Sequence, residues 1–514
     1  MRAPFAIIFI LLLSTGAMAQ RQPRADSAYL FAQSLRSVDL AQQNAVFLIN
    51  ANYDELSTVS LNYNTENGHF RTSQTAENGY DVAFKSSGIS TLNRFKVSGY
   101  FNFTRTWQDS LSWNLQGFPD EITPYYYIAG KAGKFQRLNY NFGGLLTYDL
   151  VKNKLYVASG VDYLYNTASR SVDPRPSVQT FRINLKPQLV YKFGKELLGV
   201  GLSLGYGKET NSISYRNSDY SVQSQNYADR INYLVMGYGQ TKIIGTSSLK
   251  QKSNSNGWDL NYALKSDKGY INARVNYVHD FQDNYSSLDQ SKNNLRYGSL
   301  SLNSYSGTLL AGINTASYQH QLYFNVLLQN GADRNYTELA GLSSYKYDHR
   351  QASLNYSVLK RSSSPVNVEL GFNLNYDEVT RKDISPQIAA TFGYLQPGLS
   401  VTLYKHFENK SRFSATLSPA VRLPQNNSVQ VPVTDNVFAN NIIYPDYTYW
   451  ASTAGVLGLN LKYITPKWFK DVNSGITFNG VYTTSLSNGK NSNTSMFYPS
   501  KSRLGISLSF NLYF

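Results

Sequence analysis

The sequence predicts an all-β fold, a single transmembrane antiparallel β-barrel of roughly 16 to 20 strands, preceded by a short N-terminal segment. Three observations lead to this prediction. Apolar and polar residues alternate over runs longer than most soluble strands, short and long connections alternate between these runs, and residue usage suits a surface with one wet and one apolar side.

Residue usage narrows the class of protein. Of the 514 residues, 42% are hydrophobic and only 16% are charged, and the aromatic residues comprise 42 Tyr, 26 Phe and 5 Trp. Tyr combines an apolar ring with a polar tip and is typical of membrane interfaces. So many aromatic residues exclude an intrinsically disordered chain. With zero Cys the chain has no disulfide framework and no thiolate metal site.

The first 19 residues have the pattern of a secretory signal peptide. Arg2 precedes an apolar run from Phe5 to Leu13, and small residues lead to Ala17-Met-Ala19, an A-x-A cleavage site. A membrane anchor is the alternative, but the apolar run is far shorter than the roughly 20 residues of a spanning helix. We therefore expect an exported chain that is cleaved after Ala19.

Residues 20–52 form a leader ahead of the first predicted strand. Leu30, Phe31, Leu35 and Val38 have helical spacing. A short helix here would lie inside the barrel or on its periplasmic rim. A flexible leader is the alternative.

Alternation with a period of two residues marks the strands, and it is clearest at the C-terminus. One face of the last twelve residues is apolar and carries Leu504, Ile506, Leu508, Phe510, Leu512 and Phe514. Similar alternations recur at Phe95–Phe103, Leu138–Tyr148, Leu155–Tyr165, Phe181–Phe193, Leu198–Tyr206, Trp258–Leu264, Leu322–Leu328, Val366–Tyr376, Phe413–Val421, Leu457–Tyr463 and Ile476–Tyr482.

The length and polarity of these segments favour a membrane barrel over a soluble sandwich. Many of them match the roughly 9–11 residues of a tilted membrane-crossing strand better than the roughly 5–6 residues of a soluble one. Their second faces are polar, as a wet lumen requires. One of these faces carries Arg182, Lys186 and Lys192, and another carries Glu369.

Connections between the segments alternate in length, as in outer-membrane barrels. Short connections are predicted at 151–154, 194–197, 266–269 and 361–365, and long ones at 166–179, 207–230, 280–294 and 330–351. The alternation breaks between Pro386 and Trp450, which indicates that a strand in or around Leu423–Tyr449 escapes the count. The barrel is predicted to span residues 53–514.

Two features carry a resemblance to known proteins. The terminal Phe514, with Leu512, Phe510 and Leu508 at alternate positions before it, resembles the C-terminal signal read by the barrel assembly machinery. The Tyr- and Asn-rich style, as in PYYYIAGKAGKFQRLNY at residues 124–140, resembles an uncharacterised family of Bacteroidota outer-membrane β-barrel proteins. The resemblance is compositional and covers nearly the whole mature chain. It implies the cell outer membrane of a Gram-negative bacterium, and it carries no functional residues over.

The candidate catalytic motifs do not lie in the structural context that catalysis requires. Gly201-Leu-Ser203-Leu-Gly205 fits the G-x-S-x-G nucleophile elbow, but an elbow needs a sharp turn from strand to helix, and these residues continue a strand-like alternation. Gly133-Lys134 lacks the remaining residues of a phosphate loop. The five His are scattered singly, without metal-ligand spacing. We therefore expect no enzyme, no cofactor and no metal.

The formal net charge of +15 has two interpretations. Lys and Arg at strand ends would meet lipid phosphates or extend to the interface. Alternatively, Arg182, Lys186 and Lys192 would bias the lumen toward anions. We favour the first, because Glu369 and Asp377 would share that interior. A nucleic-acid partner is not expected, since no basic, aromatic-bearing binding motif is present.

The leading functional expectation is a porin-like barrel that passes or binds small hydrophilic solutes, beside a dedicated uptake system. The alternative is a non-conducting scaffold that docks surface lipoproteins or a transporter, its lumen filled by the N-terminal segment or by infolded loops such as Leu423–Tyr449. An outer-membrane hydrolase ranks third. A TonB-dependent receptor is not expected, because the plug domain of that family is far longer than this leader. The expected partners are outer-membrane lipid, lipopolysaccharide, the assembly machinery, and an envelope lipoprotein or uptake system.

Overall fold

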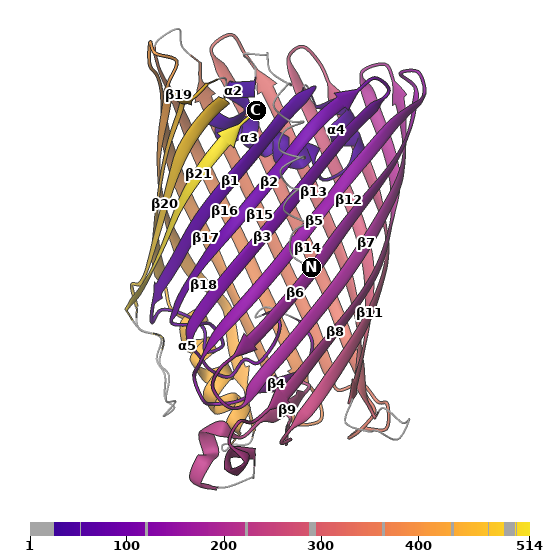
Figure 1. Ribbon diagram of the computed structural model, residues 1–514, viewed down its shortest axis with the longest axis vertical. Coiled ribbons are helices and arrows are strands. Elements are labelled where there is room, and N and C mark those ends of the chain that lie inside the picture. The colour runs from indigo at the N-terminus through magenta and orange to yellow at the C-terminus, as the bar shows by residue number, and fades with distance from the viewer. Residues whose placement is uncertain are drawn as a thin grey trace, which may run out of the picture.

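The computed structural model describes residues 25–51, 53–118, 122–221, 225–286, 295–361, 365–432, 436–470, 472–487, 499 and 501–514. Within these residues, eighteen antiparallel strands close into one barrel, because the first strand pairs with the last (Figure 1). The predicted fold and strand number are therefore confirmed. The predicted cleavage residues Ala17 and Ala19 lie outside the described residues.

The barrel strands follow one another around the wall in chain order. The first nine are β1 (Glu55–Gly68), β2 (Asn78–Leu92), β3 (Phe95–Leu111), β5 (Gly133–Val151), β6 (Leu155–Arg170), β7 (Arg175–Phe193), β8 (Glu196–Ser214), β11 (Ser247–Lys265) and β12 (Gly269–Ser286). The other nine are β13 (Arg296–Asn314), β14 (Tyr318–Asn335), β15 (Tyr345–Lys360), β16 (Val366–Asp383), β17 (Ile388–His406), β18 (Arg412–Gln430), β19 (Ala454–Phe469), β20 (Val472–Ser485) and β21 (Ser502–Tyr513).

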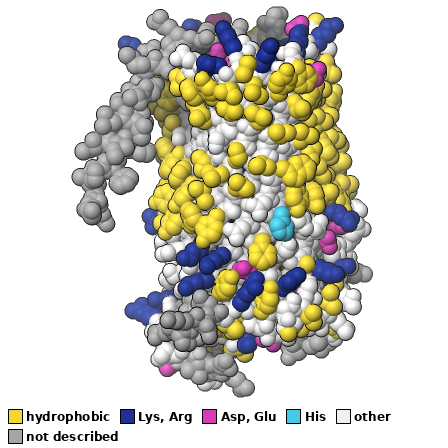
Figure 2. Space-filling view, turned by 90° about the vertical axis from the view of Figure 1, so that its right-hand side faces the viewer, with side chains coloured by type: hydrophobic (Ala, Val, Ile, Leu, Met, Phe, Trp, Pro, Cys, Tyr) yellow, Lys and Arg dark blue, Asp and Glu magenta, His cyan; other side chains and the backbone are white. Residues whose placement is uncertain are grey.

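Each strand turns its apolar residues outward. On β8, Leu198, Val200, Leu202 and Leu204 are between 41% and 55% exposed, and Tyr206 and then Lys208 end the series. Figure 2 shows the resulting hydrophobic band on the face in view, with Lys and Arg gathered above and below it. Such a band, bordered by tyrosines and cations, is the outer surface expected of a barrel that spans a membrane.

Several predicted loops are strands, so those boundaries were wrong. The predicted long connection 166–179 is a turn of only 171–174, because β6 continues to Arg170 and β7 begins at Arg175. Beyond the apolar band the outward residues become Thr167, Ser169 and Gln179, so the alternation of hydrophobicity ends before the strand does. The predicted connections 280–294 and 330–351 likewise contain the ends of β12, β14 and β15.

The break in the predicted alternation is explained by β17 and β18. No predicted segment covered β17, and β18 extends to Gln430, beyond the predicted end at Val421. The two strands join through the short connection 407–411, and β18 then leads into the long loop 431–453. Outward Pro397 interrupts the apolar stripe of β17, which is why the pattern missed that strand.

The two ends of the barrel differ. One end has short turns, the C-terminus and the helices α2 (Ala25–Leu30), α3 (Ala32–Ala41) and α4 (Ala45–Asn50) (Figure 1). The other has longer loops, with a small sheet of β4 (Tyr125–Ile128), β9 (Tyr233–Met236) and β10 (Thr241–Ile243). These loops also hold η2 (Ser218–Ser221), η3 (Gln225–Arg230), η4 (Ala439–Ile443) and α5 (Tyr444–Trp450). No helix among the described residues is long and apolar enough to cross a membrane.

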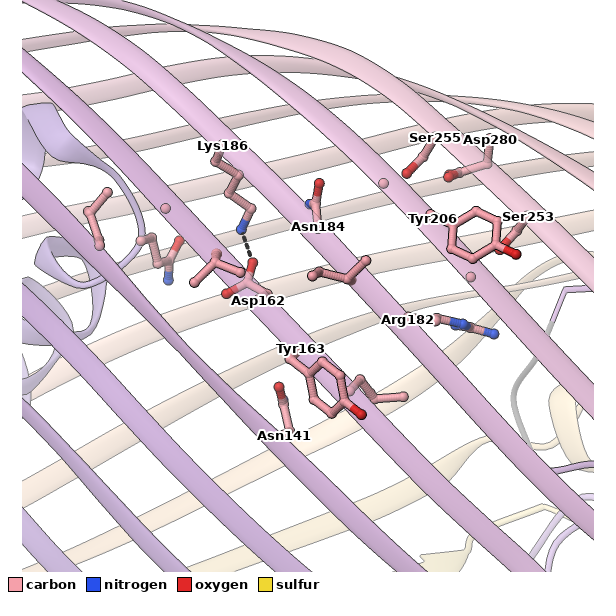
Figure 3. Close-up of a pocket in the computed structure, with 18 of the residues that line it drawn as sticks. Asn141, Asp162, Tyr163, Arg182, Asn184, Lys186, Tyr206, Ser253, Ser255 and Asp280 are labelled. Atoms are coloured by element: carbon pink, nitrogen blue, oxygen red, sulfur yellow. Dashed lines mark ion pairs between the residues drawn. The ribbon is translucent and has the colours of Figure 1, made fainter.

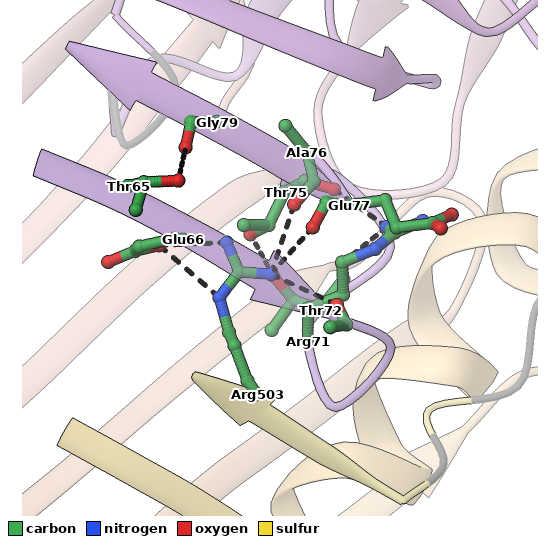
Figure 4. Close-up of polar contacts among 10 residues, drawn as sticks. Thr65, Glu66, Arg71, Thr72, Thr75, Ala76, Glu77, Gly79 and Arg503 are labelled. Atoms are coloured by element: carbon green, nitrogen blue, oxygen red, sulfur yellow. Dashed lines mark hydrogen bonds and ion pairs between the residues drawn. The ribbon is translucent and has the colours of Figure 1, made fainter. Parts of the chain in front are cut away.

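The seam between β1 and β21 is fastened at the loop end by Arg503 (Figure 4). Its guanidinium pairs with Glu66, 2.8 Å away, and donates to the carbonyl oxygens of Gly68 and Ala76, both at 3.1 Å. Gly68 has φ +141°, and a Cβ there would collide with the carbonyl oxygen of Ser502. The closing strand pair and the β1–β2 loop therefore form one fastened unit.

Candidate functional site

The lumen is filled at both ends, and two cavities remain between the fillings. We call residues 25–51 the plug, and we call the described residues of the loops 112–132, 215–246 and 431–453 the lid. The first cavity, of about 800 Å³, reaches from Gln42 and Gln43 of the plug to Ile122 and Thr123 of the lid. The second, of about 710 Å³, lies between the plug and the walls β1–β3 and β17–β21.

The plug is buried inside the turn end of the barrel. Asn44 begins α4, its side-chain oxygen accepting the N–H of Phe47 at 3.0 Å. Val46, Phe47 and Leu48 of α4 are at most 2% exposed, and α4 packs against Val190, Leu197 and Ala263 of the inner wall. The predicted helical leader is thus confirmed, and it lies inside the barrel.

Polar contacts complete the seat of the plug. Gln188 of β7 accepts the N–H of Ala45 at 2.9 Å, and Lys96 of β3 donates to the carbonyl oxygen of Ala51 at 2.7 Å. On the opposite wall, Lys462 of β19 donates to the carbonyl oxygen of Tyr29 at 2.7 Å. Contacts from several strands therefore hold the plug in one position.

The lid packs on the inner wall at the loop end. Phe438, Ile442 and Ile443, from the segment around η4, are buried with Ile128 and Val235 of the small sheet. Their neighbours on the wall are inward residues of β13, β15 and β17, among them Leu300, Leu302, Tyr345, Ile388 and Phe392. The sequence analysis predicted an infolded loop at Leu423–Tyr449. The loop is present, but it begins only after β18, because Leu423–Gln430 belongs to that strand.

Two buried carboxyl groups of the wall fasten the lid. Asp333 of β14 accepts the Tyr125 hydroxyl at 2.9 Å and the N–H of Tyr345 at 2.8 Å. Asp383 of β16 accepts the N–H of Tyr238 at 2.8 Å. The close approach requires glycine, because a Cβ at Gly298 would collide with the Tyr125 hydroxyl.

Ionic groups in the first cavity largely compensate one another (Figure 3). Lys186 forms an ion pair with Asp162, which also accepts the Tyr100 hydroxyl at 2.8 Å. The guanidinium of Arg182 lies over the ring of Phe118, 5.4 Å from its centroid, and its positive charge acts on the Asp280 carboxyl group, which lines the same cavity. The remaining lining is mostly polar and uncharged, and includes Ser98, Asn141, Asn184, Gln188, Ser253, Ser255, Gln282 and Gln329.

Glycines on β8 make room for the first cavity. The inward positions of β8 around its middle are Gly199, Gly201, Ser203, Gly205 and Gly207. A Cβ at Gly205 or Gly207 would collide with the hydroxyl of Ser255 or Ser253, respectively. At Gly199 it would collide with Val46, so the same stripe also seats the plug.

The predicted basic residues face inward, but they do not form one site. Arg182 and Lys186 line the first cavity, whereas Lys192 lies near the turn end of β7 and is not part of that lining. The sequence did not single out Tyr100, Asp162, Arg274 and Asp280, which join Arg182 and Lys186 in the cavity. Strand parity places each of them on an inward face, but their meeting depends on the closure of the barrel.

The serine motif and His349 lie in ordinary strand positions of the barrel wall. Ser203 lies in the continuous strand β8 and donates to the side-chain oxygen of Asn184 at 3.0 Å, as its strand context predicted. His349 faces the lumen beside Asp377, with 3.3 Å between Nε2 and Oδ2. In the described part of the chain, no group of three or more His, Asp or Glu side chains could hold a metal ion.

The predicted assembly signal ends the closing strand. Leu508 is 50% exposed on the outer face, and the ring of Phe510 lies 6.3 Å from that of Trp468. Leu512 pairs with Val59 of β1, and Phe514 exchanges backbone hydrogen bonds with Ser57. Recognition of these residues by the assembly machinery stays a prediction.

Comparison with known proteins identifies a family. Residues 45–514 match the model of a family described as a family of unknown function, DUF6850. No curated protein matches the chain.

Similar solved structures include a transporter, a receptor and a channel, all with low identity to this chain. The copper transporter OprC is 9% identical over 90% of this chain and 82% of its own, with a TM-score of 0.39. BauA, the ferric preacinetobactin receptor from Acinetobacter baumannii, is 10% identical over 90% and 80%, with a TM-score of 0.41. A mutant of the monoaromatic hydrocarbon channel TodX is 12% identical over 92% of each chain, with a TM-score of 0.33.

Proposed function

The chain belongs to the family of unknown function DUF6850. From that premise we propose that it is an outer-membrane barrel whose lumen binds small hydrophilic solutes. These solutes cross the membrane when the plug moves. The outer membrane is supported by the closed barrel and its apolar band, since barrels of this kind cross that membrane. The Bacteroidota origin that residue usage resembles stays a prediction.

The first cavity is the observation that carries this proposal. Its volume of about 800 Å³ falls within the roughly 300–1,000 Å³ of small-molecule sites. Hydroxyl and amide groups from β3, β5, β7, β11, β12 and β14 converge on it, and these groups are suited to hydrogen bonding with a hydrophilic solute. A barrel that served only as a scaffold would have no need for a stripe of glycines that keeps this space empty.

Passage requires one filling to move, and the plug is better placed to do so. Among the described residues, the plug is joined to the wall through β1, which follows it, whereas each loop of the lid joins two strands of the wall or of the small sheet. Displacement of the plug therefore requires no change in the distance between two wall strands. We therefore assign the gate to the plug.

The second candidate function is a non-conducting scaffold or docking partner. It is favoured by one observation, namely that plug and lid together fill both ends of the lumen. On that reading the barrel presents its loops to an envelope lipoprotein or a transporter and conducts nothing.

A disulfide lock separates the two functions. The chain contains no Cys, so Val46→Cys with Gly199→Cys introduces a single pair at the point where α4 touches β8. In a planar bilayer, we expect intermittent conductance steps from the native mature chain and from the reduced pair, and silence from the oxidised pair. The single variant Val46→Cys is the matched control, and oxidant should leave it conducting.

Two outcomes contradict the proposal. Undiminished conductance from the oxidised pair would show that solutes do not pass the plug. Silence from the native chain, from the reduced pair and from a variant whose plug is displaced would favour the scaffold.

A further inference from the structure

A basic pocket lies at the loop end of the barrel, apart from both lumen cavities. It has a volume of about 480 Å³, and three arginines, Arg175, Arg216 and Arg230, line it together with Ser171, Ser218 and Tyr220. They come from the β6–β7 turn, the start of β7 and the segment around η2 and η3, which hangs below the barrel in Figure 1.

Two of the three guanidinium groups are held in place. Arg230 donates to the carbonyl oxygen of Asp173 at 3.2 Å, and its guanidinium stacks over the ring of Tyr220, 4.1 Å from the centroid. Arg175 forms an ion pair with the Asp173 carboxylate at 2.7 Å. Because these groups are already oriented, a ligand would lose little side-chain entropy in binding them.

The third arginine has its guanidinium available. Arg216 is exposed, and within the described residues its side chain makes no hydrogen bond or ion pair, although its backbone N–H donates to Asp173 at 3.1 Å. The pocket therefore combines two fixed cations with a third that can close over a ligand.

Positive charge in this region exceeds negative charge. Among the described residues that line the pocket, Asp173 is the only acidic one, and its carboxylate is already engaged by Arg175 and by the N–H groups of Arg216 and Asn217. Burial alone would raise the pKa of Asp173, but these hydrogen bonds and the Arg175 charge lower it, so the carboxylate stays ionised. Lys131 and Asp229, 3.0 Å apart, compensate each other nearby.

A fourth arginine adds to this excess from behind the pocket. Arg170 is 5% exposed, and three backbone carbonyl oxygens accept from it, those of Val172 and Pro174 at 2.9 and 2.8 Å and that of Lys131 at 2.9 Å. These carbonyl groups accept from its Nε and Nη1 without neutralising its charge. Three arginines line the pocket and a fourth lies behind it, while the lining holds one carboxylate, so a bound anion would stabilise this arrangement.

We propose that Arg175, Arg216 and Arg230 form a binding site for a phosphoryl group at the outer mouth of the barrel. Guanidinium groups match the oxygen spacing of phosphate with paired N–H donors. The hydroxyl groups of Ser171, Ser218 and Tyr220 supply further donors, which suits a tetrahedral dianion better than a planar carboxylate. The phosphoryl group belongs either to a soluble solute or to a phosphorylated lipid headgroup, and both present the same oxygens.

Calorimetric titration of the full mature chain in detergent with inorganic phosphate tests the site. We expect saturable binding that weakens as salt rises, and about tenfold or greater weakening by Arg216→Gln or Arg230→Gln. The matched control is Arg94→Gln, since Arg94 also stacks on a tyrosine, Tyr148 at 5.0 Å, but lies at the turn end. Heat-modifiable migration confirms that each variant is folded, and Arg216→Gln removes no described side-chain contact.

Competition identifies the source of the phosphoryl group. Displacement of phosphate by a sugar phosphate assigns a soluble ligand, and displacement only by vesicles containing phosphorylated lipid A assigns a headgroup. Absence of saturable phosphate binding, equal weakening by Arg94→Gln, or equally strong competition by acetate would overturn the proposal. None of these readouts depends on conductance, so this site and the proposed function fail independently.

Discussion

Asp446 is a buried carboxyl group whose ionisation should control how firmly α5 is held. Its Oδ1 accepts the backbone N–H of Ser73 at 2.7 Å. Burial raises the pKa of Asp446 to about 6, although the Ser73 hydrogen bonds and the charges of Arg381 and Arg71 oppose that rise. Because this pKa lies above the roughly 3.9 of an unfolded chain, ionisation of Asp446 destabilises the folded lid. The cost is complete above pH 6, and it declines as the pH falls from 6 toward 4.

Asp446→Asn should therefore stabilise the lid at neutral pH and have little effect in acid. The amide keeps an acceptor for Ser73 and cannot ionise. At about pH 7.5 we expect roughly tenfold or greater slowing of hydrogen exchange in residues 436–450, since one pKa unit corresponds to about 1.4 kcal/mol. At about pH 3.5, where the carboxyl group is mostly protonated in the folded and in the unfolded chain, the two proteins should exchange almost alike. Asp219→Asn, at an exposed position in η2, is the control. A difference that is independent of pH would contradict this account.

At the scale of one element, α4 depends on glycine at a single position of β8. A Cβ at Gly199 would collide with Val46, so Gly199→Phe leaves no space for α4 in its present seat. We expect the barrel to remain closed, α4 to leave the wall, and hydrogen exchange of residues 45–50 to accelerate by about tenfold or more. In a bilayer this variant should conduct persistently.

The neighbouring Val200→Phe is the matched control for that change. Val200 is 52% exposed on the outer face, so the added ring would meet lipid and leave the plug untouched. If Gly199→Phe kept native protection in α4 and stayed closed, the contact between α4 and β8 would not be what seats the plug.

At the scale of the whole molecule, the lumen should select weakly between ions of opposite charge. Lys186 is paired with Asp162, and the charge of Arg182 acts on the Asp280 carboxyl group in the same cavity, so these two basic residues on the inner face of β7 do not act as an uncompensated ring. Reversal potentials of Gly199→Phe across a salt gradient should give an anion-to-cation permeability ratio within about twofold of one. Strong anion selectivity would contradict the compensation of charge.

Removing one carboxylate should shift that balance. Adding Asp162→Asn frees the charge of Lys186 within the first cavity and should move the reversal potential toward anion preference. Adding Asp348→Asn instead changes an exposed residue of β15, whose side chain faces away from the lumen, and should leave the potential unchanged. Equal shifts from both variants would point to a general surface-charge effect.

Local patterns along the chain determined the class of fold. The outward residues of β8 can be identified from sequence, from Leu198 to Tyr206 and Lys208. At every second position, apolar residues are favoured next to lipid, tyrosine at the interface and charged residues in water. The same period assigned Arg182, Lys186 and Lys192 to an inward face. It could not locate strand ends beyond the apolar band, where both faces of β6 and β7 are polar and the selection by lipid no longer acts.

Which residues meet in the first cavity depends on the closure of the barrel. Asp162, Arg182, Arg274 and Asp280 come from three strands and meet only because the sheet curves round, so no spacing in the sequence relates them. The burial of α4 against Gly199, the lid held by Asp333 and Asp383, and the arginine pocket likewise join segments that are distant in sequence. The sequence by itself determined which faces meet lipid and water, a choice made residue by residue. Only the tertiary structure decided which inward residues meet and that the lumen is filled, because those contacts depend on long-range packing.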